Sequence, residues 1–207
     1  LSIHSFPTRR SSDLGMVIFC SLCGLICLIR RLTIYFSLGF TVPIQPGPER
    51  DRTIARFVHI NQFAARLMAT ELAVFDYSLF ALWTMRSALE TAPPCVSPSD
   101  PLEAFVPAAA AWISILGPQV YHWDKEFEHG PRVGAPGKGG PLWENGKHGF
   151  CKERWELWRK SFGAIAETGG DLSEDVRSCA RQAGKTMKEI EIDRKSTRLN
   201  SSHQYYL

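Results

Sequence analysis

Apolar side chains recur at helical spacing through most of this sequence. From Asp51 onward they return every three or four positions, and no stretch alternates apolar and polar residues over the length of a convincing strand. The chain has 207 residues, of which 44% are hydrophobic, so it has room for one core and does not have the composition of a disordered chain. The pattern predicts an all-α fold, a single-domain bundle of about five helices with a long Gly/Pro-rich loop.

Start and stop signals place these helices. We predict them at about residues 52–70, 76–89, 101–116, 152–167 and 174–190. The third has the clearest start, because DPLE at 100–103 supplies an N-cap, a proline at the first helical position and a glutamate three residues after the cap. Pro107 is expected to kink or shorten this helix, and Gly117-Pro118 to end it. Asp76 and Ser173 are expected to cap the second and fifth helices.

One face of each predicted helix is expected to be buried. The tryptophans on these faces are predicted to pack in the core rather than stack on nucleic-acid bases, with the neighbouring Arg159 and Lys160 solvated. In helix order, the predicted core includes Ile54, Phe57, Val58, Ile60, Phe63, Ala64, Leu67 and Met68, then Trp83, then Trp112, then Trp155, Trp158, Phe162 and Ile165, and last Val176, Ala180, Ala183, Met187 and Ile190.

Both ends of the chain resemble translated sequencing adapter. The strings HSFPTRRSSDL at 4–14 and DRKSTRLNSSH at 193–203 read as translations of the two adapters that flank a short-read insert. We therefore predict that residues 1–14 and 193–207 are assembly artefact and that the helical domain spans residues 51–192. Without the two ends, cationic and anionic residues are equal in number. The net charge of +3 then gives no support to a nucleic-acid partner, and we predict none.

An apolar segment at residues 15–48 precedes the predicted domain. It is interrupted by Arg30-Arg31 and fits neither a membrane span of about 20 apolar residues nor a complete secretory signal. Three origins stay open: a clipped anchor, a signal remnant, or translated non-coding sequence, which we favour. A membrane partner is expected only if residues 15–44 are genuine.

The cysteines favour a reducing, intracellular compartment. Three of them lie at positions 20, 23 and 27 in the apolar segment, with no second ligand pair to support a zinc or redox site. The other three, Cys95, Cys151 and Cys179, form an odd set without close spacing. A disulfide scaffold is therefore not predicted.

Several motifs, in order and spacing, resemble a family of mostly fungal proteins of unknown function (DUF3632-like) over about residues 51–190. They are HINQF at 59–63, FDYS at 75–78, ALWTMRSALE at 81–90, VPAAAAWI at 106–113, GPLW at 140–143, GF at 149–150 and ERWELW at 153–158. The resemblance implies an all-helical fold, no assigned activity, and authentic helix missing where residues 15–48 stand. Cys151 departs from the family pattern, which has a serine suited to capping the next helix.

Two stretches of the sequence resemble binding motifs, one for a metal ion and one for a phosphate group. His122, Glu126 and His129 have spacings of four and three, as metal ligands on one helical face have. Gly130-Pro131 and the charged neighbours favour a solvated surface instead, so no metal site is predicted. The glycines at 134–140 do not make a phosphate-binding loop, because Gly139 follows Lys138 where that loop needs serine or threonine.

Cys151 lies near a predicted helix start, where the helix dipole is expected to lower the pKa of its thiol. His148 is the one nearby base, in a glycine-rich loop, so no catalytic pair is predicted. The polar residues that remain candidates for a functional site are His122, Glu126, His148 and Cys151.

The sequence identifies neither a specific function nor a partner. The interpretation it favours is a non-catalytic intracellular interaction domain without a cofactor, for which a protein is one candidate partner. The first alternative is a small-molecule-binding protein or enzyme with a pocket near the 130–149 loop, lined by the four polar candidates. The second is a membrane-tethered helical protein that uses residues 15–44.

Overall fold

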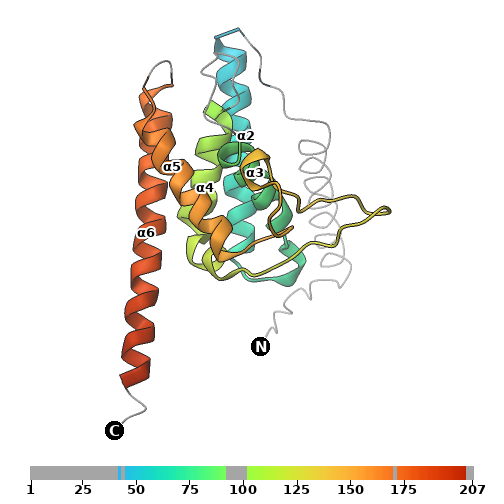
Figure 1. Cartoon of the computed structure of the whole chain (residues 1–207). Helices are drawn as coiled ribbons and strands as arrows, with labels where there is room; N and C mark the ends of the chain where they lie inside the picture. Colours follow the sequence, from blue (N-terminus) through green and yellow to red (C-terminus); the bar gives the residue numbers. More distant parts are fainter. Residues whose placement is uncertain (1–41, 43–44, 92–101, 170–171, 204–207) are drawn as a thin grey trace, which may run out of the picture. The chain divides into compact units, whose positions relative to one another are not determined.

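A computed structural model describes residue 42 and residues 45–91, 102–169 and 172–203 (Figure 1). These residues form five α-helices: α2 (Pro48–Met68), α3 (Ser78–Leu89), α4 (Leu102–His122), α5 (Lys152–Glu167) and α6 (Glu174–His203). Two 3-10 helices, η1 (Ala73–Phe75) and η2 (Pro141–Trp143), lie between them, and the described residues contain no strand. The predicted all-α bundle is confirmed. The expectations for residues 1–41 and for Cys95 lie outside the described residues.

Helix α4 is the centre of the bundle. It contacts α2, α3 and α6, and α5 packs on α6 and α3. Figure 1 draws α4 in light green, between α2 in blue to cyan and α6 in red. By length and composition alone α4 is apolar enough to cross a membrane, but 56% of that stretch is buried inside the domain. Burial of this kind is typical of the core helix of a bundle.

Helix α4 runs unbroken through Pro107 and Gly117-Pro118, so the expected shortening at Pro107 and the expected end at Gly117-Pro118 are wrong. Proline inside a helix costs about 3 kcal/mol, so tertiary packing must offset that cost. Val106, next to Pro107, and Leu116, two residues before Pro118, are almost completely buried. Gly117 serves packing rather than termination, since a Cβ there would lie 2.7 Å from Ile190 Cδ1 of α6.

The buried stripe of α2 is narrower than the sequence pattern suggests. Phe57, Asn61, Ala64 and Ala65 are buried, whereas Phe63 is 44% exposed, which corrects its assignment to the core. Phe63 comes six positions after Phe57, so on a helix of 3.6 residues per turn it is rotated by roughly 240° from Phe57 and does not share its buried face. An asparagine occupies the core position that the apolar pattern left out.

Helices α5 and α6 pair along their predicted faces. Helix α5 has the predicted bounds, and its Trp155, Trp158 and Phe162 are buried. Ser173 caps α6 as expected, since its Oγ accepts a hydrogen bond from Val176 N (3.4 Å). Helix α6 continues beyond the predicted end at residue 190 to His203. Of its predicted core positions, Val176, Ala180, Ala183 and Met187 are buried, whereas Ile190 is only half-buried, which corrects its assignment to the core.

Gly163, inside α5, gives a first prediction. A Cβ added there meets no atom within 4 Å, so alanine would fit without moving a neighbour. Because glycine in a helix interior is less stable than alanine by about 0.5–1 kcal/mol, we expect Gly163→Ala to raise the free energy of unfolding by that amount. Urea denaturation followed by circular dichroism measures it. A neutral or destabilising result would show that the helix is distorted at this position.

Candidate functional site

A buried ion pair joins the end of α3 to α5. The side chains of Glu90 and Arg154 are both completely buried, and Arg154 Nε and Nη2 donate to the two Glu90 carboxylate oxygens at 2.7 and 3.0 Å. Trp158 Nε1 and Gly140 N also donate to this carboxylate, each at 2.7 Å. Every carboxylate oxygen therefore has two donors, which is the condition under which a buried charge is tolerated.

The same pair holds the loop between α4 and α5. Arg154 Nη1 donates to Gly149 O (2.7 Å) and Gly137 O (3.1 Å), and Leu142 N donates to Glu90 O (3.0 Å). The loop glycines allow this close packing: a Cβ at Gly137 would overlap His148 O, and a Cβ at Gly149 would overlap Lys125 O. The predicted Gly/Pro-rich loop is thus fixed to the core at its root.

From this root, residues 126–137 extend away from the helices as an arm, drawn in yellow and olive (Figure 1). Phe127 N donates to His148 O and Phe150 N to Lys125 O, both at 2.8 Å, at the base. At the tip, Gly130 N donates to Gly134 O (2.8 Å) and Gly134 N to Gly130 O (2.9 Å). Backbone hydrogen bonds therefore fix the arm at both ends.

The polar candidates are not gathered into one site. Helix α4 ends at His122, so His122, Glu126 and His129 do not share a helical face. Within the described ranges, no group of three or more His, Cys, Asp or Glu side chains is placed to hold a metal. The His148 ring contacts the His129 ring, with centroids 4.2 Å apart and planes tilted by 40°, and the buried Nδ1 of His148 has no hydrogen-bond partner.

Cys151 lies at the N-cap of α5 without a side-chain capping bond. Burial raises the pKa of its thiol, and the Glu153 carboxylate adds to the effect, while the backbone N–H of Arg154 opposes it. The net direction is upward, so the expected lowering by the helix dipole is wrong. Desolvation outweighs the dipole here, and the thiol is less reactive than a free one at neutral pH.

A pocket of about 350 Å³ opens where α2 ends, beside η1 and the start of α3. Its apolar lining consists of Met68, Leu72, Ala73, Phe75 and Trp123, and its polar lining of Glu71, Asp76, Ser78 and Lys125. None of the four polar candidates lines it. The sequence signal for it was weak: a short polar–apolar stretch between two helices, with no motif of its own.

Three of the four polar groups in this pocket are bonded to one another. Asp76 Oδ1 accepts from Ser78 N (3.0 Å) and Ser78 Oγ (2.6 Å), and Asp76 Oδ2 pairs with Lys125 Nζ (2.5 Å). Burial raises the pKa of Asp76, but the hydrogen bonds from Lys125 and Ser78 together lower it by more than burial raises it. The pKa of Asp76 is therefore below its usual value. Glu71 makes no ion pair within the described part of the chain and is the pocket's unneutralised charge.

The backbone at Glu71 is left-handed, with φ of 59°, and among the described residues other than glycine no other has positive φ. It follows the last turn of α2, where Glu71 N donates to Met68 O (2.9 Å). After this turn the chain enters η1. Leu72, just before η1, is 57% exposed to solvent, and Val74, inside it, is 68% exposed. A strained residue thus shapes an apolar rim at the pocket.

We expect Glu71→Gly to raise the free energy of unfolding by about 1 kcal/mol, because glycine adopts this conformation without the Cβ clash that other residues meet. Thermal and urea unfolding measure the gain. Glu71→Ala is the matched control, since it removes the charge and keeps the Cβ. Equal stabilisation by both substitutions would mean that the charge, and not the backbone, is the unfavourable feature.

Comparison with known protein families identifies a match to this chain. A family model described as a protein of unknown function (DUF3632) matches residues 30–162, which include α2 through most of α5 and the whole arm. No curated protein matches the chain, and no solved structure does.

Proposed function

Because the chain belongs to the DUF3632 family, whose description assigns no activity, we propose a function from its site alone: a non-catalytic interaction domain that binds a partner protein at the pocket beside η1. The observation that carries the proposal is the exposed apolar rim. Leu72 and Val74 are 57% and 68% exposed next to the apolar pocket lining. Exposed apolar surface around a pocket is typical of protein-binding sites.

The chemistry of the described residues supports binding over catalysis. Glu90 and Arg154 are saturated with hydrogen bonds in the core, out of reach of a substrate. In the pocket, Asp76 and Lys125 neutralise each other, and the pKa of Asp76 is shifted away from the range of a general base at neutral pH. What the pocket offers a partner is apolar area and the Glu71 carboxylate.

An intracellular location is part of this proposal. Cys151 and Cys179 both carry free thiols, and burial raises the pKa of each, as in structural cysteines of reducing compartments. The alternative of a small-molecule site near the 130–149 loop stays a prediction that no described geometry favours. The alternative of a membrane tether concerns residues 15–44, which lie almost entirely outside the described residues.

Peptide selection tests the proposal. Random twelve-residue peptides displayed on phage are selected on the immobilised full chain, and enriched peptides are then titrated in solution by fluorescence anisotropy. We expect peptides with a large apolar residue next to a basic one. Their affinity should fall at least about tenfold for Leu72→Asp, the loss typical of a central interface residue.

Leu142→Asp is the matched control, since Leu142 is 45% exposed in η2 and packs near Glu90, at the opposite end of α3 from the pocket. It should leave peptide affinity unchanged. Circular dichroism must show the same helical content for both variants. If no peptide is enriched, or if Leu72→Asp binds the peptides as well as the unsubstituted chain, the pocket is not a protein-binding site.

A further inference from the structure

We infer that the partner is a second copy of this chain, whose arm tip enters the pocket and places Val133 on the apolar lining and Arg132 beside Glu71. This inference rests on the proposed function of the pocket as a protein-binding site. It adds the identity of the partner and the residues on both sides of the contact.

The arm tip has the chemistry that the pocket lacks. Pro131, Arg132 and Val133 are exposed, and Val133 is 50% exposed although it is apolar. Arg132 makes no ion pair within the described residues, just as Glu71 makes none. The tip therefore presents an apolar side chain next to a cation, and the pocket presents an apolar lining next to an anion.

The arm is held ready for such a contact before a partner arrives. Its tip is closed by the reciprocal Gly130–Gly134 hydrogen bonds, and its end next to the root is fixed by Trp83 Nε1, which donates to Pro136 O (2.8 Å). Arg154 binds its root through Gly137 O and Gly149 O. A fixed segment loses little conformational entropy on binding, which favours it as a docking element over a free loop.

The pocket has room for this tip. At about 30 Å³ per water molecule, a volume of about 350 Å³ corresponds to roughly twelve waters. This space accepts the valine side chain together with part of the arginine stem. Trp123 and Phe75 in the lining provide aromatic surface for the stem, while the guanidinium reaches the Glu71 carboxylate at the rim.

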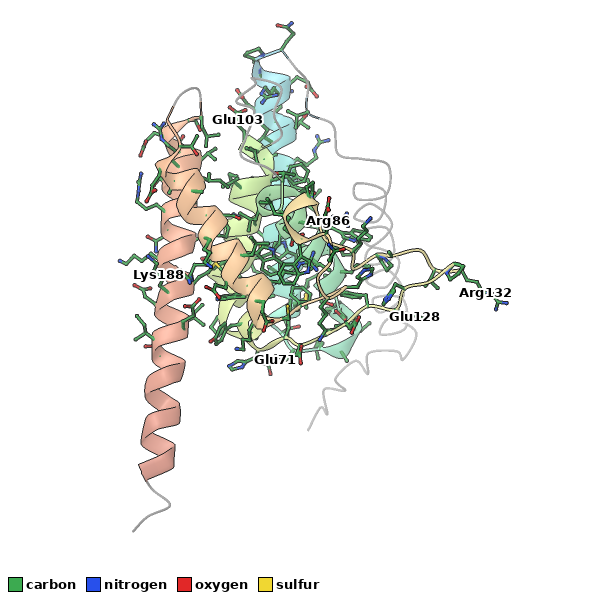
Figure 2. The ribbon with its side chains drawn as sticks, in the orientation of Figure 1. Glu71, Arg86, Glu103, Glu128, Arg132 and Lys188 are labelled. Atoms are coloured by element: carbon green, nitrogen blue, oxygen red, sulfur yellow. The ribbon has the colours of Figure 1, made fainter. Side chains whose placement is uncertain are left out.

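The contact has to form between two copies. Figure 2 shows Glu71 at the lower edge of the helices and Arg132 at the far end of the arm, which points away from them. The hydrogen bonds at the root keep the arm extended, so the tip cannot fold back to its own pocket. A pair of copies related by a two-fold axis would make the contact twice, as isologous dimers do.

Sedimentation velocity of the full chain, from about 5 to about 500 µM, tests the inference, because two small contacts give a weak dimer. We expect concentration-dependent dimerisation of the unsubstituted chain. Arg132→Glu and Glu71→Arg should each weaken it at least about tenfold, since each places like charges together. Combining Arg132→Glu with Glu71→Arg restores opposite charges and should return the dissociation constant to within about threefold of the original.

Lys188→Glu is the matched control, because it reverses another exposed cation, on α6, away from both surfaces (Figure 2). It should leave dimerisation unchanged. A monomer at every concentration, a dimer indifferent to both charge reversals, or a double variant that fails to recover overturns the inference. If the chain stays monomeric while the selected peptides still bind the pocket, the inference fails and the proposed function stands. If neither binds, both fail.

Discussion

Arg154→Met is expected to lower the free energy of unfolding by about 3–5 kcal/mol, the usual loss when one partner of a buried ion pair is removed. The substitution leaves the Glu90 carboxylate with no cation at a position that is completely buried. It also removes the donor that Gly137 O and Gly149 O share. Urea denaturation followed by tryptophan fluorescence measures the loss.

Arg159→Met is the matched control on the same helix. Arg159 Nε pairs with Glu191 Oε1 at 2.9 Å, and both side chains are about one-fifth exposed. Solvent reaches this pair, and Glu191 keeps the hydrogen bond from Trp155 Nε1 when Arg159 is replaced, so we expect a smaller loss of about 1 kcal/mol. Equal losses from the two substitutions would show that the completely buried pair contributes no more than a partly exposed one.

The double variant Glu90→Leu/Arg154→Met separates the energy of the interaction between Glu90 and Arg154 from the energies of their contacts with other residues. Removing both charges leaves no unpaired ion in the core, so the double variant should lose less stability than the two single losses added together. Hydrogen exchange of residues 126–150 should rise in all three variants, because the root of the arm depends on the pair. Additive losses would mean that Glu90 and Arg154 act independently.

The helices could be predicted from the sequence where apolar periodicity, capping residues and flanking glycines all indicated the same bounds. Helix α5 has the bounds predicted from its periodic tryptophans and the glycine-rich loop before it, and Ser173 caps α6 as predicted. The prediction failed where packing overrode local preference. Pro107 and Gly117 read as interruptions, yet the burial of α4 on three sides keeps it helical.

The candidate site could not be predicted in the same way. Glu71 contributes through a left-handed backbone that no local motif signals, and the Asp76–Lys125 pair joins residues 49 positions apart. The Glu90–Arg154 pair spans 64 positions. Spacing along the chain detects ligands on one helix, which is why it selected His122 and Glu126 instead. Contacts set by tertiary structure leave no such periodicity.

Asn61→Leu is the second large effect that we expect, a loss of about 2–4 kcal/mol. Asn61 Oδ1 accepts hydrogen bonds from Trp112 Nε1 (2.8 Å) and Thr84 Oγ1 (2.9 Å), and so joins α2, α3 and α4 in the core. Leucine has a similar size but no acceptor, so the buried indole N–H would lose its partner, at a cost of about 1–3 kcal/mol. Thr84 loses less, because Phe80 O lies 3.0 Å from its hydroxyl and accepts the same O–H when Asn61 Oδ1 is gone.

A double-mutant cycle separates two causes of the lost stability: the unsatisfied indole N–H of Trp112 and the leucine side chain in the core. Trp112→Phe removes the donor, so adding it to the Asn61→Leu background removes the unsatisfied group. The two losses should then sum to more than the loss of the double variant. Gln62→Leu, an amide replaced on the same helix outside this network, should change stability by less than about 0.5 kcal/mol. Full additivity in the cycle would mean that the hydrogen bond contributes nothing and that Asn61 is held in the core by shape alone.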